Sequence, residues 1–297
     1  MYNKCMKSLR KALAWAEKNQ VAIGHFNISD SEGFKAVVEA AKELGVPVII
    51  GVSEGERAFI GLQEVVSLVK IARGNGLDVF VNADHTYSME KARAAIDAGM
   101  DSVIIDEAGK PLEENIKLTK EIVDYARSRT KGRTLSIDSQ GSTLVEGELG
   151  FIGVSSKVLE KLPDGVSQDS QTKPEDAKRF VEETGIDLFA PSVGNVHGLV
   201  KSGQPKLNIE RIKALREVVK VPLVLHGGSG ISDEDFLSAI VAGIRVIHIN
   251  TELRLAYKEG IAEGLKSGEI APYKFMETGV EEMKKVVRER LRLFNKL

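Results

Sequence analysis

Short apolar runs alternate with longer amphipathic segments along most of the chain. The apolar runs are rich in β-branched residues and end in polar or glycine-containing clusters, as buried parallel strands do. We expect strands at residues 21–27, 47–53, 78–84, 102–106, 187–193, 222–226 and 245–250, and one more within 134–148. The pattern does not fix where that last strand, the fifth in chain order, begins.

Helical periodicity fills most of the intervals between these strands. The predicted helices are 32–44, 62–73, 89–98, 112–129, 174–184, 209–219 and 233–242. Side chains that can cap a helix stand at two of the starts, and glycines stand at four of the ends. These residues are Ser88 and Ser232 at the starts, and Gly45, Gly99, Gly185 and Gly243 at the ends. Repeated βα units with eight strands predict a single (β/α)8 TIM barrel.

Helical segments are also expected before and after the barrel in the sequence. One lies at about 7–18, within an N-terminal segment 1–20. The other is a charged tail at about 277–294, within a C-terminal helical extension 258–297. Its apolar residues recur at helical spacing, so it is expected to pack on the barrel or on another subunit. No linker divides the chain, which predicts one domain over 1–297.

Composition narrows the class of protein further. The chain has 297 residues, 42% of them hydrophobic and 28% charged, with a net charge of −2. This balance gives no reason to expect a nucleic-acid partner. The single cysteine, Cys5, excludes an intramolecular disulfide, and no apolar run reads as a signal peptide or a membrane span. We therefore expect a cytoplasmic protein with no membrane partner.

Ionisable residues gather where the predicted strands end, which is where the active site of such a barrel lies. Three of the five histidines follow strand ends, and a fourth, His248, lies inside the last strand. The residues at these ends are Asp84 and His85, Asp106, Glu146 and Glu148, His197 within 194–198, and His226. One such histidine alone would usually be structural, but three that converge by topology favour a metal site.

The chemistry of this set suits zinc. Three neutral imidazoles are suitable ligands for Zn²⁺ and leave a coordination position open for substrate. Asp84 is the candidate for proton transfer, and the alternative is that it only orients a histidine. Neighbouring strand residues point to opposite faces, so Asp84 and His85 can both face the site only if the chain turns there.

A glycine-rich turn supplies a candidate phosphate site. Residues 227–230 read Gly227-Gly228-Ser229-Gly230 and lie between a predicted strand and a predicted helix. Asn250 and Thr251 end the next strand and strengthen this interpretation. The nearby cations Lys201 and Arg254 could assist or be ordinary surface residues. No lysine ends a strand, which disfavours a Schiff-base aldolase.

Five motifs together resemble the class II fructose-bisphosphate/tagatose-bisphosphate aldolase family. They are 82–85 (NADH), 145–150 (VEGELG), 194–198 (GNVHG), 225–230 (LHGGSG) and 250–254 (NTELR), and the similarity runs from about residue 21 to 257. The resemblance implies a reversible aldol reaction between dihydroxyacetone phosphate and glyceraldehyde 3-phosphate. It also implies a catalytic zinc on His85, His197 and His226, with Asp84 transferring the proton of the C4 hydroxyl.

The resemblance assigns roles to further residues. Asp106 and Glu148 would form an alternative or second metal position. The dihydroxyacetone phosphate end would be bound by Gly198, Gly227, Ser229 and Thr251, with a monovalent cation near the phosphate. Ser53 would contact the other triose phosphate. Arg254 would reach the distal phosphate across a subunit contact, which implies a homodimer or a homotetramer.

Two departures from the family pattern bear on the chemistry. Residues 151–157 (FIGVSSK) lack the acidic loop residue that handles the proton at C1, and His248 stands where the family usually has an asparagine. Cleavage of fructose 1,6-bisphosphate is the preferred hypothesis. The alternatives are an aldolase for tagatose 1,6-bisphosphate or another phosphorylated ketose, and a non-catalytic barrel that binds metal and phosphate.

Overall fold

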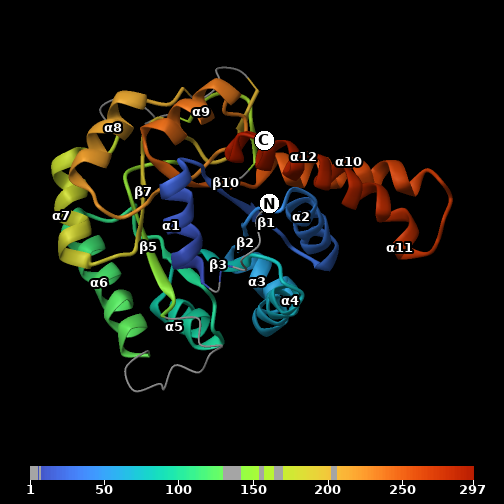
Figure 1. Cartoon of the computed structure of the whole chain (residues 1–297), viewed down its shortest axis with the longest axis horizontal. Helices are drawn as coiled ribbons and strands as arrows, with labels where there is room; N and C mark the ends of the chain where they lie inside the picture. The colour runs from blue at the N-terminus through green and yellow to red at the C-terminus, as the bar shows by residue number, and fades with distance from the viewer. Residues whose placement is uncertain (1–5, 7, 130–141, 154–156, 164–169, 202–205) are drawn as a thin grey trace.

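Parallel strands close into a barrel in the computed structural model of the chain (Figure 1). The structure describes residues 6, 8–129, 142–153, 157–163, 170–201 and 206–297. The barrel strands are β1 Ile23–Asn27, β2 Val48–Val52, β3 Val79–Thr86, β4 Ser102–Ile105, β5 Leu144–Leu149, β7 Leu188–Pro191, β9 Leu223–Leu225 and β10 Ile244–Ile249. Around the barrel they follow the order β1-β10-β9-β7-β5-β4-β3-β2.

The predicted strands and the barrel are confirmed, with shifts at the ends. β5 begins at Leu144, whereas the part of the predicted interval at 134–141 lies outside the described residues. β3 is longer than expected and continues through His85 to Thr86. A two-stranded sheet of β6 (Val158–Leu159) and β8 (Leu199–Val200) was not expected, because two-residue strands leave no periodicity to detect.

The helices follow the predicted periodicity closely. They are α1 Leu9–Asn19, α2 Ser31–Leu44, α3 Glu54–Ile60, α4 Leu62–Gly74, α5 Met89–Ala98, α6 Leu112–Ser128, α7 Pro174–Thr184, α8 Ile209–Val218, α9 Asp233–Ala242, α10 Thr251–Leu265, α11 Pro272–Phe275 and α12 Glu277–Asn295. Ser88 and Ser232 cap α5 and α9 through their side chains, as predicted. The short helix α3 was missed, and α10 begins before the expected extension at 258.

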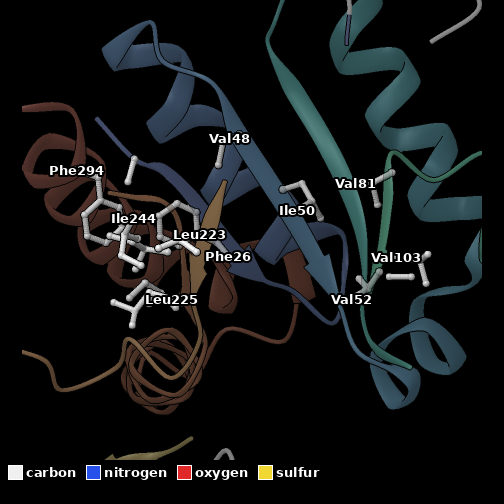
Figure 2. Packing of buried hydrophobic residues seen from close by; sticks show 14 of the residues in the cluster. Phe26, Val48, Ile50, Val52, Val81, Val103, Leu223, Leu225, Ile244 and Phe294 are labelled. Carbon is white, nitrogen blue, oxygen red and sulfur yellow. The ribbon is translucent and has the colours of Figure 1, made fainter. Parts of the chain in front are cut away.

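Alternate strand residues face two different layers. Outward residues such as Phe26, Ile50 and Ile244 pack with the surrounding helices, and Figure 2 shows Phe26 and Ile244 beside Phe294 of α12. Inward residues such as Phe80 form a separate cluster with α1 at the amino ends of the strands. The carboxyl ends are thereby left for polar side chains.

The C-terminal helices flank the barrel on one side. Figure 1 shows α10, α11 and α12 extending away from the strands, and α12 also packs on α2. The Phe294 ring meets that of Phe236 in α9, with centroids 5.1 Å apart. Within the described part of the chain, no helix is both long enough and apolar enough to span a membrane.

Candidate metal centre and active site

Three histidines converge at the carboxyl end of the barrel. His85 lies in β3, His197 follows β7, and His226 follows β9. The ring centroid of His85 is 4.7 Å from that of His197 and 5.1 Å from that of His226, and the last two are 5.7 Å apart. The structure thus brings together the three residues that the sequence predicted as metal ligands.

In each of these three rings, one nitrogen is hydrogen-bonded to an oxygen of another residue. The acceptors are Asp106 Oδ2 for His85 Nδ1 at 2.8 Å, the Gly153 carbonyl for His197 Nδ1 at 2.9 Å, and Glu146 Oε1 for His226 Nε2 at 2.8 Å. A proton on the engaged nitrogen leaves a lone pair on the other one, which is how second-sphere groups orient metal-binding histidines. The lone pairs then lie on His85 Nε2, His197 Nε2 and His226 Nδ1.

Glu148 and the three histidines form a group of four, and their four ligand atoms all lie within 4.8 Å of one another. Glu148 Oε2 is 3.1 Å from His226 Nδ1, yet these two buried atoms and His197 Nε2 have no hydrogen-bond partner. Two acceptors at that distance require a cation or a proton between them. This donor set fits a divalent metal ion. Asp106 is not in the group and instead hydrogen-bonds to His85.

The electrostatics of the group agree with this fit. Burial opposes a charge on His226, but its contacts with the Glu146 and Glu148 carboxylates raise its pKa well above the usual value. Burial also opposes a charge on His85, whereas the charge of Asp84 helps to raise its pKa to about 9. The carboxylates therefore attract positive charge to the point where the histidines meet, and a metal ion would replace the protons there.

The backbone turns at His85, as simultaneous access of Asp84 and His85 requires. His85 has a φ of 37°, and the β3–β4 register shifts between Ala83 and Thr86. The buried Arg57 side chain holds this turn by donating to the Asp84 carbonyl at 3.0 Å and to Thr86 Oγ1 at 3.1 Å. Left-handed backbone is strained for a residue with a side chain, so such contacts are needed to maintain it.

The Asp84 carboxylate is oriented by Asn27, whose Nδ2 donates to Oδ2 at 2.8 Å. The other oxygen, Oδ1, is buried without a hydrogen-bond partner and lies 3.5 Å from His248 Nδ1. Burial opposes the charge, but the neighbouring His85 and His248 bring the pKa of Asp84 well below its usual value. These neighbours favour the ionised form of Asp84, whose Oδ1 is not engaged by a hydrogen bond.

A pocket lies over these residues. It is lined by Asn27, Asp84, His85, His197, Gly198, Gly227, Gly228, Ser229, His248, Asn250 and Thr251. Gly227 has a φ of 62°, and a Cβ there would lie 2.3 Å from the Val196 carbonyl oxygen, so only glycine fits. Ser229 Oγ accepts from the backbone nitrogens of Asn250 and Glu252 at the start of α10. The predicted phosphate residues thus meet at a helix N-terminus.

Besides the buried His226, five predicted site residues lie outside the lining of this pocket. Lys201 forms an exposed ion pair with Glu160. Arg254 pairs with Glu56 of the same chain, and Ser53 donates its backbone N–H to that carboxylate. Asp106 and Glu148 border the metal group without lining the pocket.

The structure also shows a polar layer that the sequence did not reveal. His25 of β1 stands opposite His248 of β10 in register, and the two rings stack 3.5 Å apart. His248 in turn stacks on His226 at 4.2 Å. Gly51 leaves room for the His25 ring, since a Cβ there would lie 2.0 Å from it. The sequence did contain a signal for His25: the period of two along β1 places it on the same face as Asn27, and therefore inside the barrel.

Comparisons with known proteins agree with this site. A family model described as fructose-bisphosphate aldolase class-II matches residues 7–297. This chain belongs to the class II fructose-bisphosphate aldolase family. Membership confirms the resemblance inferred from the motifs, and it makes the chain an aldolase, a carbon–carbon lyase.

Individual relatives of this class II aldolase match over nearly their whole length. Fructose-bisphosphate aldolases of Geobacillus stearothermophilus and Staphylococcus epidermidis are 36% and 35% identical, and each match covers 97% of this chain and 96% of the relative. The crystal structure of the YdjI aldolase from Escherichia coli K12 superposes with a TM-score of 0.79 at 32% identity, covering 97% of this chain and 96% of that one. The barrel is therefore an aldolase barrel.

Proposed function

We propose that this aldolase reversibly cleaves a phosphorylated ketose, with fructose 1,6-bisphosphate as the first substrate, into dihydroxyacetone phosphate and glyceraldehyde 3-phosphate. The observation that carries the proposal is that the candidate metal group of three histidines and Glu148 borders one pocket, which Asp84 and a glycine-lined helix N-terminus also line. These are the three parts that metal-dependent cleavage of a sugar phosphate requires.

The metal is proposed to be zinc, held by His85, His197 and His226, with Glu148 as a further ligand. Bound there, zinc acts as a Lewis acid that stabilises negative charge on the substrate oxygens. Asp106 supports this position by fixing the His85 ring, and it is also the candidate for a second metal position together with Glu148. The donor set of imidazoles and carboxylate suits zinc.

Asp84 is proposed to move the proton of the C4 hydroxyl. During cleavage its carboxylate accepts that proton while the C3–C4 bond breaks and the aldehyde forms. The electron pair stays on the dihydroxyacetone phosphate half, which then takes up a proton at carbon. Asn27 holds Asp84 in place through Oδ2, while Oδ1 has no hydrogen-bond partner, and Asp84 lines the pocket.

The phosphate of the dihydroxyacetone half is proposed to bind at the start of α10. The glycine-rich turn and the N-terminus of α10 both line the pocket there, and a helix N-terminus favours an anion. Asn250 Oδ1 is buried without a hydrogen-bond partner and is a candidate ligand for a monovalent cation beside that phosphate. His248 borders the same pocket and is proposed to contact the substrate.

We propose a homodimer or homotetramer in the cytoplasm. Exposed apolar side chains in the projecting C-terminal segment support an association surface, since Ile270, between α10 and α11, is 89% exposed and Tyr273 of α11 is 75% exposed. Sedimentation of the purified protein tests this directly.

The proposed function is tested by cleavage of fructose 1,6-bisphosphate, measured by coupled detection of triose phosphate, before and after chelation and zinc add-back. We expect activity to disappear with the chelator and return with zinc. His226→Ala should lose metal and activity together. No activity in the zinc-loaded protein would favour another ketose, with tagatose 1,6-bisphosphate tested next. Binding of dihydroxyacetone phosphate without turnover of any ketose would favour the non-catalytic barrel.

A further inference from the structure

The Glu56 carboxylate is surrounded by donors from three elements beside the pocket. Its side chain belongs to α3, and the residue is only 6% exposed. Oε2 accepts from the Ser53 backbone N–H at 2.7 Å and from Asn27 Nδ2 at 2.9 Å, and Oε1 pairs with Arg254 Nη2 at 2.5 Å. An amide, a backbone N–H and a guanidinium are the groups that usually bind an external anion. Here they bind the chain's own carboxylate.

Asn27 connects this carboxylate directly to the reacting end of the pocket. The same Nδ2 that donates to Glu56 also donates to Asp84 Oδ2 at 2.8 Å. The glycine-rich phosphate site lies after β9 and β10, whereas Asn27 ends β1 and Glu56 follows β2. A ketose with its phosphate at that site and its C4 hydroxyl at Asp84 therefore directs its far end toward Asn27 and Glu56.

A phosphate at the far end of the ketose would meet an unfavourable arrangement. It would approach a fixed negative charge, and recruiting Arg254 would break the Arg254–Glu56 pair. Breaking such a pair leaves a largely buried carboxylate without its counterion, which is strongly unfavourable. A hydroxyl at the same position carries no charge and meets neither penalty.

We propose that Glu56 is a specificity-determining residue that favours ketose 1-phosphates whose aldehyde half ends in a hydroxyl over ketose bisphosphates. The proposal rests on the proposed aldolase function and specifies its substrate class. It accounts for the positions of Ser53 and Arg254, which are the residues expected at a distal phosphate but are engaged by Glu56 in this chain.

The test compares kcat/KM for fructose 1-phosphate and fructose 1,6-bisphosphate in the zinc-loaded enzyme. Both yield dihydroxyacetone phosphate, so one coupled assay serves for both. We expect the wild type to prefer fructose 1-phosphate. Glu56→Gln, which removes the charge and keeps the shape, should raise the bisphosphate-to-monophosphate ratio by about tenfold or more. Because the ratio is taken within one protein, a lower folded fraction does not affect it.

Two variants sharpen the test. Glu54→Gln makes the same charge change in α3, at a carboxylate that pairs with Lys91, and should leave the ratio unchanged. Adding Arg254→Gln to Glu56→Gln should abolish the gain, because the gain comes from an arginine freed to bind phosphate.

Three results would overturn the proposal. A wild type that does not prefer fructose 1-phosphate, or an unchanged ratio in Glu56→Gln, would show that Glu56 does not set this preference. A gain that survives the double substitution would show that Arg254 is not the freed group. Absence of cleavage of both ketoses by the zinc-loaded wild type would instead overturn the proposed function, and this proposal with it.

Discussion

The two halves of the barrel interior differ sharply in chemistry although the same strands build both. Near the amino ends the inward side chains are apolar: Ile23, Ile49, Phe80, Leu144, Leu188, Val224 and Val246, closed below by Leu9 and Leu13 of α1. Two residues further along, the inward side chains include His25, Asn82, Glu146, His226 and His248. Along the strands that carry these polar residues, the apolar inward residue and the polar inward residue are thus only two positions apart.

The two layers therefore contribute differently to stability and to binding. The lower layer has only apolar contacts to satisfy and can be packed densely. The upper layer holds buried acceptors without partners, such as Asp84 Oδ1, Glu148 Oε2 and His197 Nε2. Unsatisfied buried polar atoms are unfavourable for the folded protein, and they are also the atoms that bind substrate or metal. Stability and function are therefore expected to respond separately to substitutions in the two layers.

The largest effect is expected in the upper layer at Asp84. Asp84→Ala should lower kcat for ketose cleavage by about 10²–10⁴-fold, because it removes the group that accepts the C4 hydroxyl proton. Bound zinc, measured by elemental analysis, should stay stoichiometric since Asp84 is not in the histidine–Glu148 group. Asp97→Ala, an exposed carboxylate in α5, is the matched control. Near-normal turnover in Asp84→Ala would remove Asp84 from the mechanism.

The lower layer should show the opposite behaviour at Phe80. Phe80 is fully buried beneath the polar layer, and Phe80→Ala should lower the free energy of unfolding by about 3–5 kcal/mol through the cavity it leaves. Urea denaturation measures this loss, while metal content and kcat per folded molecule should change little. Phe59→Ala, at a side chain 78% exposed, is the control and should be nearly neutral. A large loss of kcat in folded Phe80→Ala would contradict the separation of the layers.

The sequence predicted the barrel because hydrophobic periodicity and helix caps are local properties. It also predicted that the three candidate metal-ligating histidines lie together, since strand ends of a barrel meet by topology. It did not reveal the Glu146–His226 contact, the His25–His248 stack or the hydrogen bond from Arg57 to the Asp84 carbonyl. These contacts depend on strand register and on side chains that cross between units, and neither is encoded in a local pattern.

The smallest effect is expected at Glu146, an upper-layer residue of β5 that follows the lower-layer residue Leu144 by two positions. Glu146→Gln keeps an acceptor for His226 Nε2 but removes the charge that makes the ring a stronger ligand. We expect metal affinity, measured by competition with a chromophoric chelator, to fall by about 10–100-fold, with kcat near normal once metal is saturating. Glu121→Gln, at an exposed carboxylate of α6, is the control. Unchanged affinity in Glu146→Gln would mean that the His226 ring is oriented by packing alone. A lower kcat at saturating metal would mean that Glu146 acts on the substrate as well as on the histidine.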